Sequence, residues 1–217
     1  LLFSPYSSAD SGLPWAGVVE SEYTSGTSVI YSPDGSLLVS SHHNTFLIIE
    51  TINNSIKQSI VVDFPIQSFE FSSNSKYLLV GMNSALPNTP ATVVFELIDG
   101  EYVRGKHTEE GVDIDSVSIS PDNSVFATAS EDDAIIEWYI DTGSGTKLDI
   151  FRYFPLLHDG KINCIDHSND GEHILSGAED GRLIIWNRSD QTEVTSWEMS
   201  DPVKDCAFSP DGSKMAW

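Results

Sequence analysis

Two neighbouring stretches of this chain each contain a histidine, a hydroxyl side chain, an aspartate and a tryptophan. The two sets are His158, Ser176, Asp180 and Trp186, and His107, Thr128, Asp132 and Trp138. A hydrolase builds its nucleophile, its general base and the group that orients the base from such residues. A catalytic triad is seldom duplicated in neighbouring repeats, and the second set has threonine for serine without a nucleophile elbow. We therefore expect structural roles, no catalytic residue and no enzyme activity.

Candidate metal ligands are few. His42 and His43 are adjacent, so in a β-turn they point to different sides, and no nearby Cys, Asp or Glu cluster completes a metal shell. Asp-Gly pairs recur along the chain, but none has oxygen ligands at the spacing of a calcium loop with a closing glutamate. These residues predict turns, and we expect neither a metal nor a cofactor.

One turn motif recurs along the whole chain. It stands at Ser32-Pro33-Asp34-Gly35, Ser120-Pro121-Asp122-Asn123, Ser168-Asn169-Asp170-Gly171 and Ser209-Pro210-Asp211-Gly212, with a degraded copy at Ser72-Ser73-Asn74-Ser75. Successive copies are 40, 48, 48 and 41 residues apart. Proline presets φ, aspartate hydrogen-bonds its own backbone, and glycine accepts a positive φ. The spacing predicts a repeat architecture.

Short runs of β-branched and aromatic residues flank each turn. Residues 117–119 precede one copy, residues 37–39 follow another, and a third run such as 183–186 leads to a more polar fourth, such as 192–197. These runs are typical of strands, and no segment keeps a helical period. Four antiparallel strands per 40–48 residues predict one propeller blade, so the expected fold class is all-β.

The order of the markers resembles that of the WD40-repeat β-propellers over residues 15–217. The best copy has His158-Asp159-Gly160, the turn at 168–171, Ser176-Gly177 with Asp180-Gly181, and Trp186-Asn187. No copy contains the Trp-Asp dipeptide, and Glu50 and Phe95 stand where the first two copies are expected to have tryptophan. The resemblance implies that each marker set forms a buried chain of hydrogen bonds from the indole through the hydroxyl and the histidine to the aspartate.

The resemblance divides the chain into four whole repeats and an incomplete fifth, at approximately 15–51, 52–97, 98–140, 141–188 and 189–217. Propellers of this family usually close with about seven or eight blades. We therefore expect a fragment of about four and a half blades. In an alternative arrangement, residues 1–6 and 15–20 complete the last blade and close a five-bladed ring.

Two cysteines, Cys164 and Cys206, lie on the first strands of successive repeats and are offset by one position. Neighbouring positions on a strand face opposite sides, so we expect the two thiols to be unpaired core residues. Two cysteines are no disulfide framework, which favours a reducing compartment. We expect an intracellular location, cytoplasmic or nuclear.

The chain is strongly acidic, with 33 Asp and Glu against 11 Lys and Arg and a net charge of −22. This excess disfavours direct binding to nucleic acids and to anionic membranes. Residues 96–141 contain 13 acidic and two basic residues. In an up-and-down blade, the loop before the first strand and the turn after the second lie at the same end. The acidic residues expected to share this rim are Glu109, Glu110, Asp113, Glu131, Asp133, Asp159 and Glu179.

The acidic rim is either a solvated surface that prevents edge pairing or a docking surface for a basic segment. We expect a non-catalytic scaffold that binds other proteins, as a subunit of a complex. The alternative is the propeller domain of a larger enzyme or sensor, such as a prolyl-oligopeptidase-like peptidase or a signalling ATPase. The last copy, with Trp217 in place of the strand serine, resembles those peptidase propellers as much as the WD40 repeats.

Overall fold

The computed structural model describes residues 28–84, 86–109, 111–140 and 146–217. All regular elements of this part of the chain are β-strands, and it contains no helix long and apolar enough to cross a membrane. Residues 1–6 and 15–20, from which the alternative ring closure was predicted, lie outside the described residues.

Eighteen strands form four four-stranded antiparallel sheets and a terminal hairpin. The first sheet comprises β1 (Val29–Tyr31), β2 (Leu37–His42), β3 (Thr45–Glu50) and β4 (Ser55–Val61). The second comprises β5 (Ile66–Phe71), β6 (Tyr77–Met82), β7 (Thr92–Ile98) and β8 (Glu101–His107). The third comprises β9 (Ile114–Ile119), β10 (Val125–Ser130), β11 (Ile135–Tyr139) and β12 (Ile150–Tyr153). The fourth comprises β13 (Ile162–His167), β14 (His173–Ala178), β15 (Arg182–Asn187) and β16 (Glu193–Glu198), and the hairpin comprises β17 (Ala207–Phe208) and β18 (Met215–Ala216).

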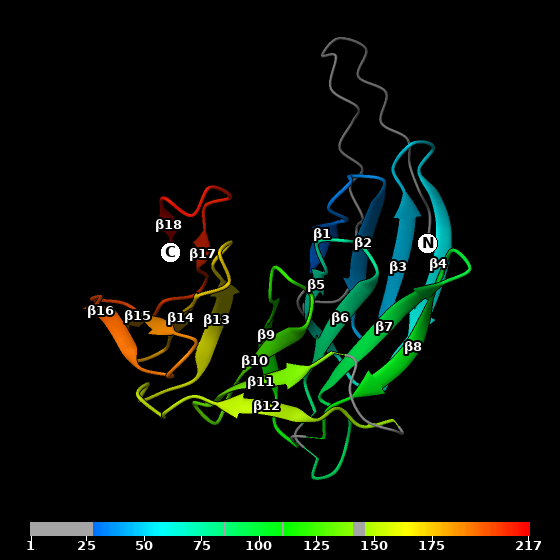
Figure 1. Cartoon of the computed structure of the whole chain (residues 1–217). Helices are drawn as coiled ribbons and strands as arrows, with labels where there is room; N and C mark the ends of the chain where they lie inside the picture. Colours follow the sequence, from blue (N-terminus) through cyan, green and yellow to red (C-terminus); the bar gives the residue numbers. More distant parts are fainter. Residues whose placement is uncertain (1–27, 85, 110, 141–145) are drawn as a thin grey trace.

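The sheets follow one another as propeller blades in an open arc. The first strands touch in chain order, β1 with β5, β5 with β9, β9 with β13 and β13 with β17. Figure 1 shows the terminal hairpin well apart from β1, at the other end of the arc. The predicted all-β fold of four whole blades and a partial fifth is confirmed. Each predicted repeat boundary falls at the end of a third strand, so the fourth strand of each sheet lies beyond that boundary.

The recurrent turn has the same local chemistry in each sheet. In the third sheet, the Ser120 hydroxyl donates to Asp122 Oδ1 (2.6 Å), and Asp122 Oδ1 also accepts the backbone N–H of Ser124 (3.0 Å). The equivalent hydroxyls of Ser32, Ser72, Ser168 and Ser209 bond an Asp or Asn two residues later. The hydrogen bond from Ser32 is the largest of the contacts that lower the pKa of Asp34 to about 2.

Apolar side chains fill each interface between neighbouring sheets. Four clusters are buried, one for each of the four interfaces in the arc. Between the first two sheets, the ring of Phe46 lies 5.3 Å from those of both Phe69 and Phe95. Between the third and fourth, Phe154 lies edge-on to Trp186 at 5.8 Å. The blades therefore gain their stability largely from one another's faces.

A hydrogen bond that recurs from blade to blade joins the first strands of neighbouring sheets. These strands are sheet edges, so some of their N–H groups lack a partner within the sheet. A side chain of the preceding blade accepts them, in the bonds from Ile119 N–H to Glu70 Oε2 (3.0 Å), from His167 N–H to Ser118 Oγ (3.0 Å) and from Phe208 N–H to Asp166 Oδ2 (2.6 Å). Burial raises the pKa of Glu70, which the charge of Asp166 raises further, and burial also raises the pKa of Asp166 to about 6.

The register corrects the expected position of one marker. Trp138 pairs with Phe126 and Trp186 with Ile174, each six residues after the turn serine. In the first sheet the equivalent residue, Leu38, pairs with Ile49. Ile49, and not Glu50, therefore occupies the tryptophan position.

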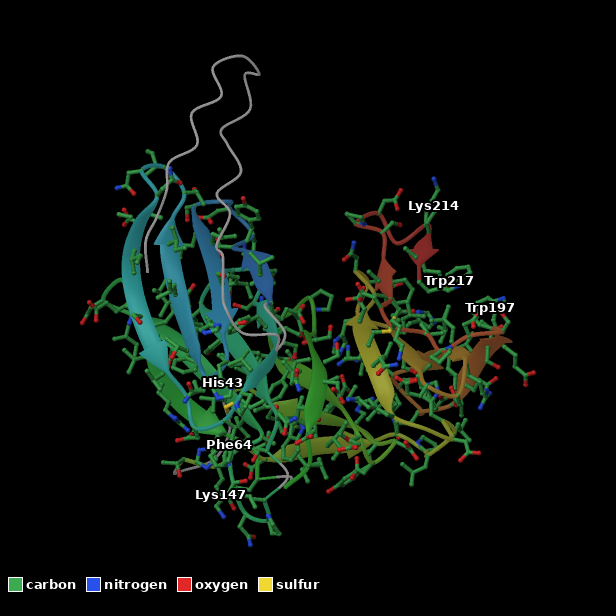
Figure 2. All side chains as sticks on the ribbon, turned by 180° about the vertical axis from the view of Figure 1, so that it is seen from behind. His43, Phe64, Lys147, Trp197, Lys214 and Trp217 are labelled. Carbon is green, nitrogen blue, oxygen red and sulfur yellow. A yellow bond between two sulfur atoms is a disulfide. The ribbon has the colours of Figure 1, made fainter. Side chains whose placement is uncertain are left out.

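The expectation that the two cysteines are unpaired is wrong, because Cys164 and Cys206 form a disulfide with Cα atoms 5.6 Å apart. Equivalent positions of successive blades point the same way around the arc. A contact across the interface therefore needs positions of opposite parity, and the offset of one supplies them. Cys206 also precedes β17, so no strand ladder fixes its direction. Figure 2 shows the sulfur bond beside the terminal hairpin.

We expect the disulfide to stabilise the attachment of the terminal hairpin. It closes a loop with a sequence separation of 42 residues, for which the loss of unfolded-state entropy corresponds to about 3–4 kcal/mol. In urea unfolding, a reductant should lower the free energy of unfolding of the wild-type chain by this amount. The double variant Cys164→Ala, Cys206→Ala should not respond to the reductant. Complete alkylation of both thiols in the native, unreduced chain would contradict the disulfide.

Asp166 should make stability dependent on pH. Its pKa is about 6 in the folded state against 3.8 ordinarily, so the folded chain binds the extra proton. The stability due to this proton is complete below pH 3.8 and is lost as the pH rises through about 6. Asp166→Asn keeps an acceptor for Phe208 and removes the titration. The free energy of unfolding of the variant minus that of wild type should therefore be more positive at pH 8 than at pH 4. A difference between Asp166→Asn and wild type that does not change with pH would refute the assignment.

Candidate functional site at the two ends of the blades

The marker set of the fourth sheet forms a continuous chain of hydrogen bonds. Trp186 Nε1 donates to Ser176 Oγ (2.8 Å), which lies 2.8 Å from His158 Nε2. His158 Nδ1 lies 3.1 Å from Asp180 Oδ2. The loop before β13, the strands β14 and β15, and the turn between those strands supply these four residues. These hydrogen bonds thereby tie two strands, the loop before β13 and the β14–β15 turn together.

The environment of this chain supports a structural role. Ser176 and Trp186 are fully buried, so no substrate reaches the hydroxyl. Burial lowers the pKa of His158, although the charge of Asp180 opposes this effect. Asp180 also accepts the backbone N–H groups of Asp159 and Arg182. The carboxylate therefore holds the loop before β13 against the β14–β15 turn.

The structure brings together only half of the second marker set. Trp138 Nε1 donates to Thr128 Oγ1 (3.1 Å), as in the fourth sheet. His107, however, is the last residue of β8 and lies 3.6 Å from Glu109, while Asp132 accepts a hydrogen bond from Ser130. The physical reason is spacing. His158 lies ten residues before its turn serine and His107 thirteen, so that His107 is still within the preceding strand.

Acidic side chains gather around Lys161, at the end of the third and fourth sheets where the loops before β9 and β13 lie. Lys161 Nζ lies 2.7 Å from Asp115 Oδ1, and Asp113 and Glu131 lie within its electrostatic reach. Burial raises the pKa of both Asp113 and Asp115, and the charge of Glu131 adds to the effect. Asp113 Oδ1 and Asp115 Oδ2 are buried without a hydrogen-bond partner. One lysine thus faces more negative charge than it neutralises.

The other predicted rim residues lie in loops at this end. Glu109 pairs with Lys147 (2.5 Å), and Glu179 pairs with Lys204. Asp133 occupies the β10–β11 turn with a φ of 64°, and Asp159 lies in the loop before β13. Glu110 lies outside the described residues.

Sequence analysis missed a buried charged network between the third and fourth sheets. Glu137 is fully buried, and its Oε1 lies 3.0 Å from His167 Nε2 and 2.8 Å from Arg188 Nε. Its Oε2 lies 3.0 Å from Arg152 Nε, although the angle is too poor for a hydrogen bond. Burial raises the pKa of Glu137, but His167 and Arg188 more than offset this and hold it below its usual value.

A sequence signal for this network does exist. The register aligns Glu137 with Ile48, Val94 and Ile185 of the other sheets. A carboxylate at an otherwise apolar strand position needs cationic partners when it is buried. In the sequence, Glu137 stands in the run Ile135-Ile136-Glu137-Trp138, in which the other three residues are apolar.

These features define an open arc of β-propeller blades. Comparison with known proteins shows which family and which structures the chain is similar to. The family model "WD domain, G-beta repeat" matches residues 102–138 and 154–187. The β-propeller domain of Cps50 (Swd1) from Myceliophteria thermophila superposes with a TM-score of 0.72 at 19% identity, over 89% of this chain and 62% of that one. At this identity, the likeness shows the fold.

Curated proteins of similar sequence are also found. The serine-threonine kinase receptor-associated protein of Gallus gallus is 23% identical over 190 residues, which are 87% of this chain and 50% of that protein. The guanine nucleotide-binding protein subunit beta-2 of Caenorhabditis elegans is 37% identical over 65 residues, 27% of this chain and 16% of that protein. This chain therefore spans half or less of these relatives. The matches confirm the resemblance: the chain carries WD40 repeats folded as β-propeller blades.

The buried chain of the fourth sheet should contribute to stability. Ser176→Ala leaves the indole N–H of Trp186 and a ring nitrogen of His158 without a partner, which costs about 1–3 kcal/mol. Chemical denaturation monitored by tryptophan fluorescence measures the loss. Ser200→Ala, which removes an exposed hydroxyl, is the matched control and should change little. An unchanged stability of Ser176→Ala would argue against the structural role.

Proposed function

We propose that this chain is a non-catalytic scaffold that binds other proteins. The observation that carries the proposal is the contrast between its polar groups. The serine, histidine and aspartate that could perform chemistry are committed to a buried chain that includes Ser176 and His158. The carboxylates of the acidic rim, in contrast, gather in loops at one end of the blades.

The partner segment that fits the rim is basic. Lys161 is shared by Asp113, Asp115 and Glu131, and one oxygen each of Asp113 and Asp115 has no hydrogen-bond partner. A lysine or arginine side chain of a partner would offset this surplus of negative charge by pairing with the exposed carboxylates of the rim. The exposed residues Glu131 and Asp159 would extend the attraction along the rim.

Assembly with other proteins agrees with the names of the relatives. One is a receptor-associated protein and another is a subunit of a guanine nucleotide-binding protein. By analogy, we propose that this chain acts within a protein complex, without direct contact to nucleic acid or to a membrane. An intracellular location, cytoplasmic or nuclear, stays a prediction, as does the alternative of a propeller domain within a larger enzyme or sensor.

Neutralising the rim should weaken binding of a basic peptide. The triple variant Glu131→Gln, Asp133→Asn, Asp159→Asn removes three charges of the rim, and we expect its affinity for a short oligolysine peptide to fall about tenfold at low salt. Titration calorimetry measures the affinity, which should also fall with added salt for the wild-type chain.

The matched control removes the same net charge from the opposite end of the blades. The residues of this control are Asp99, Glu172 and Asp190, changed to their amides; they lie in or beside turns at the other end of the strands. If both triple variants weaken binding equally, overall charge and not the rim attracts the peptide, and the docking proposal fails.

A further inference from the structure

We propose that a cavity between the third and fourth sheets binds an oxyanion, that is, a carboxylate or a phosphate group carried by a partner protein. The cavity lies at the end of the blades that carries the turns after β9, β13 and β15. This end of the blades is opposite to the acidic rim. The required ligand charge is also opposite, so the inference does not depend on the docking of basic segments.

The cavity has a volume of about 440 Å³ and lies between the two sheets. Asp122 and Glu172 come from the turns after β9 and β13, and Arg188 from the turn after β15. Tyr139 at the end of β11, and Phe151 and Arg152 on β12, complete the wall. Two neighbouring blades thus contribute one arginine each.

The convergence of two arginines is unusual in a chain with 11 basic residues and a net charge of −22. Both guanidinium groups contact the single buried carboxylate of Glu137. Asp122, which also lines the cavity, interacts electrostatically with Arg188 as well. Burial lowers the pKa of Arg152; the charge of Glu137 opposes this, and the charge of Arg188 adds to it. An anion beside the accessible Arg152 guanidinium would offset its repulsion by Arg188.

The two arginines are held in place before any ligand arrives. Arg188 uses Nε and Nη2 on Glu137 and donates Nη1 to the carbonyl of Gly171 (2.5 Å). The Arg152 guanidinium carbon lies 3.9 Å from the ring centre of Phe151. Its side chain keeps 20% of its surface exposed, so that it remains accessible from the cavity. A planar, fixed guanidinium is well suited to carboxylate and phosphate oxygens.

Two acidic residues in the lining oppose an anion. The carboxylate of Asp122 accepts hydrogen bonds from the hydroxyls of Ser120 and Ser124 and belongs to the turn. Glu172 is exposed at the lining, and the partners of Glu137 are His167, Arg152 and Arg188 instead. Glu172 therefore tests the sign of the ligand's charge, because neutralising this carboxylate should strengthen the binding of an anion.

The experiment titrates the chain with acetate and, separately, with inorganic phosphate at constant ionic strength. The backbone amide signals of Gly171 and Ser189 in heteronuclear NMR spectra report on the cavity. We expect saturable shifts in the wild-type chain and in the control Arg104→Gln, which removes an arginine of the second sheet that pairs with Asp63. Arg152→Gln should weaken binding about tenfold or more, because a charged donor is lost. Glu172→Gln should tighten it.

The relative affinities of the two probes distinguish the sources. Tighter binding of phosphate indicates a phosphorylated partner residue, and similar or tighter binding of acetate indicates an aspartate or a glutamate. Shifts that do not saturate, or equal affinities of wild type, Arg152→Gln and Glu172→Gln, would overturn the proposal. If Arg152→Gln does not fold, the direction of the change in Glu172→Gln decides alone.

Discussion

The packing of sheet face against sheet face is the constraint on which this structure depends. No helix covers the sheets in the described part of the chain, so each blade buries its faces against the next one. Equivalent positions point the same way around the arc, and contacts between blades therefore join positions of opposite parity. The disulfide between Cys164 and Cys206 and the hydrogen bond from Phe208 to Asp166 both follow this rule.

The same constraint determines where polar chemistry is possible. Polar groups within an interface need partners, as in the hydrogen bonds from Trp186 to Asp180 and in the contacts of Glu137 with His167 and two arginines. Polar groups at the ends of the strands do not need partners within the protein, because the turns there are exposed to water. The two ends differ in character: carboxylates surround Lys161 at one, and two arginines line a cavity at the other. A scaffold with two such ends offers partners two surfaces of different chemistry.

Sequence analysis succeeded where a property is local. The turn serines with their aspartates, and the strands around them, follow from short-range preferences, and the repeated spacing led to the blades. It failed where the position of a residue in the fold was inferred from sequence spacing alone. His107 was assigned to a buried chain but lies in β8, and the tryptophan position of the first sheet was placed at Glu50 instead of Ile49. A shift of one residue reverses the face of a strand, and three residues separate a strand from a loop.

The amino-acid sequence by itself determined the all-β class, the number of blades and the acidic character of the loops, because turn chemistry, strand propensity and charge are read residue by residue. Only the tertiary structure decided which residues meet across blades. Cys164 with Cys206, and Glu137 with Arg152 and Arg188, are brought together by the rotation that relates one sheet to the next. That rotation arises from the packing of whole faces, and no single stretch of sequence contains it.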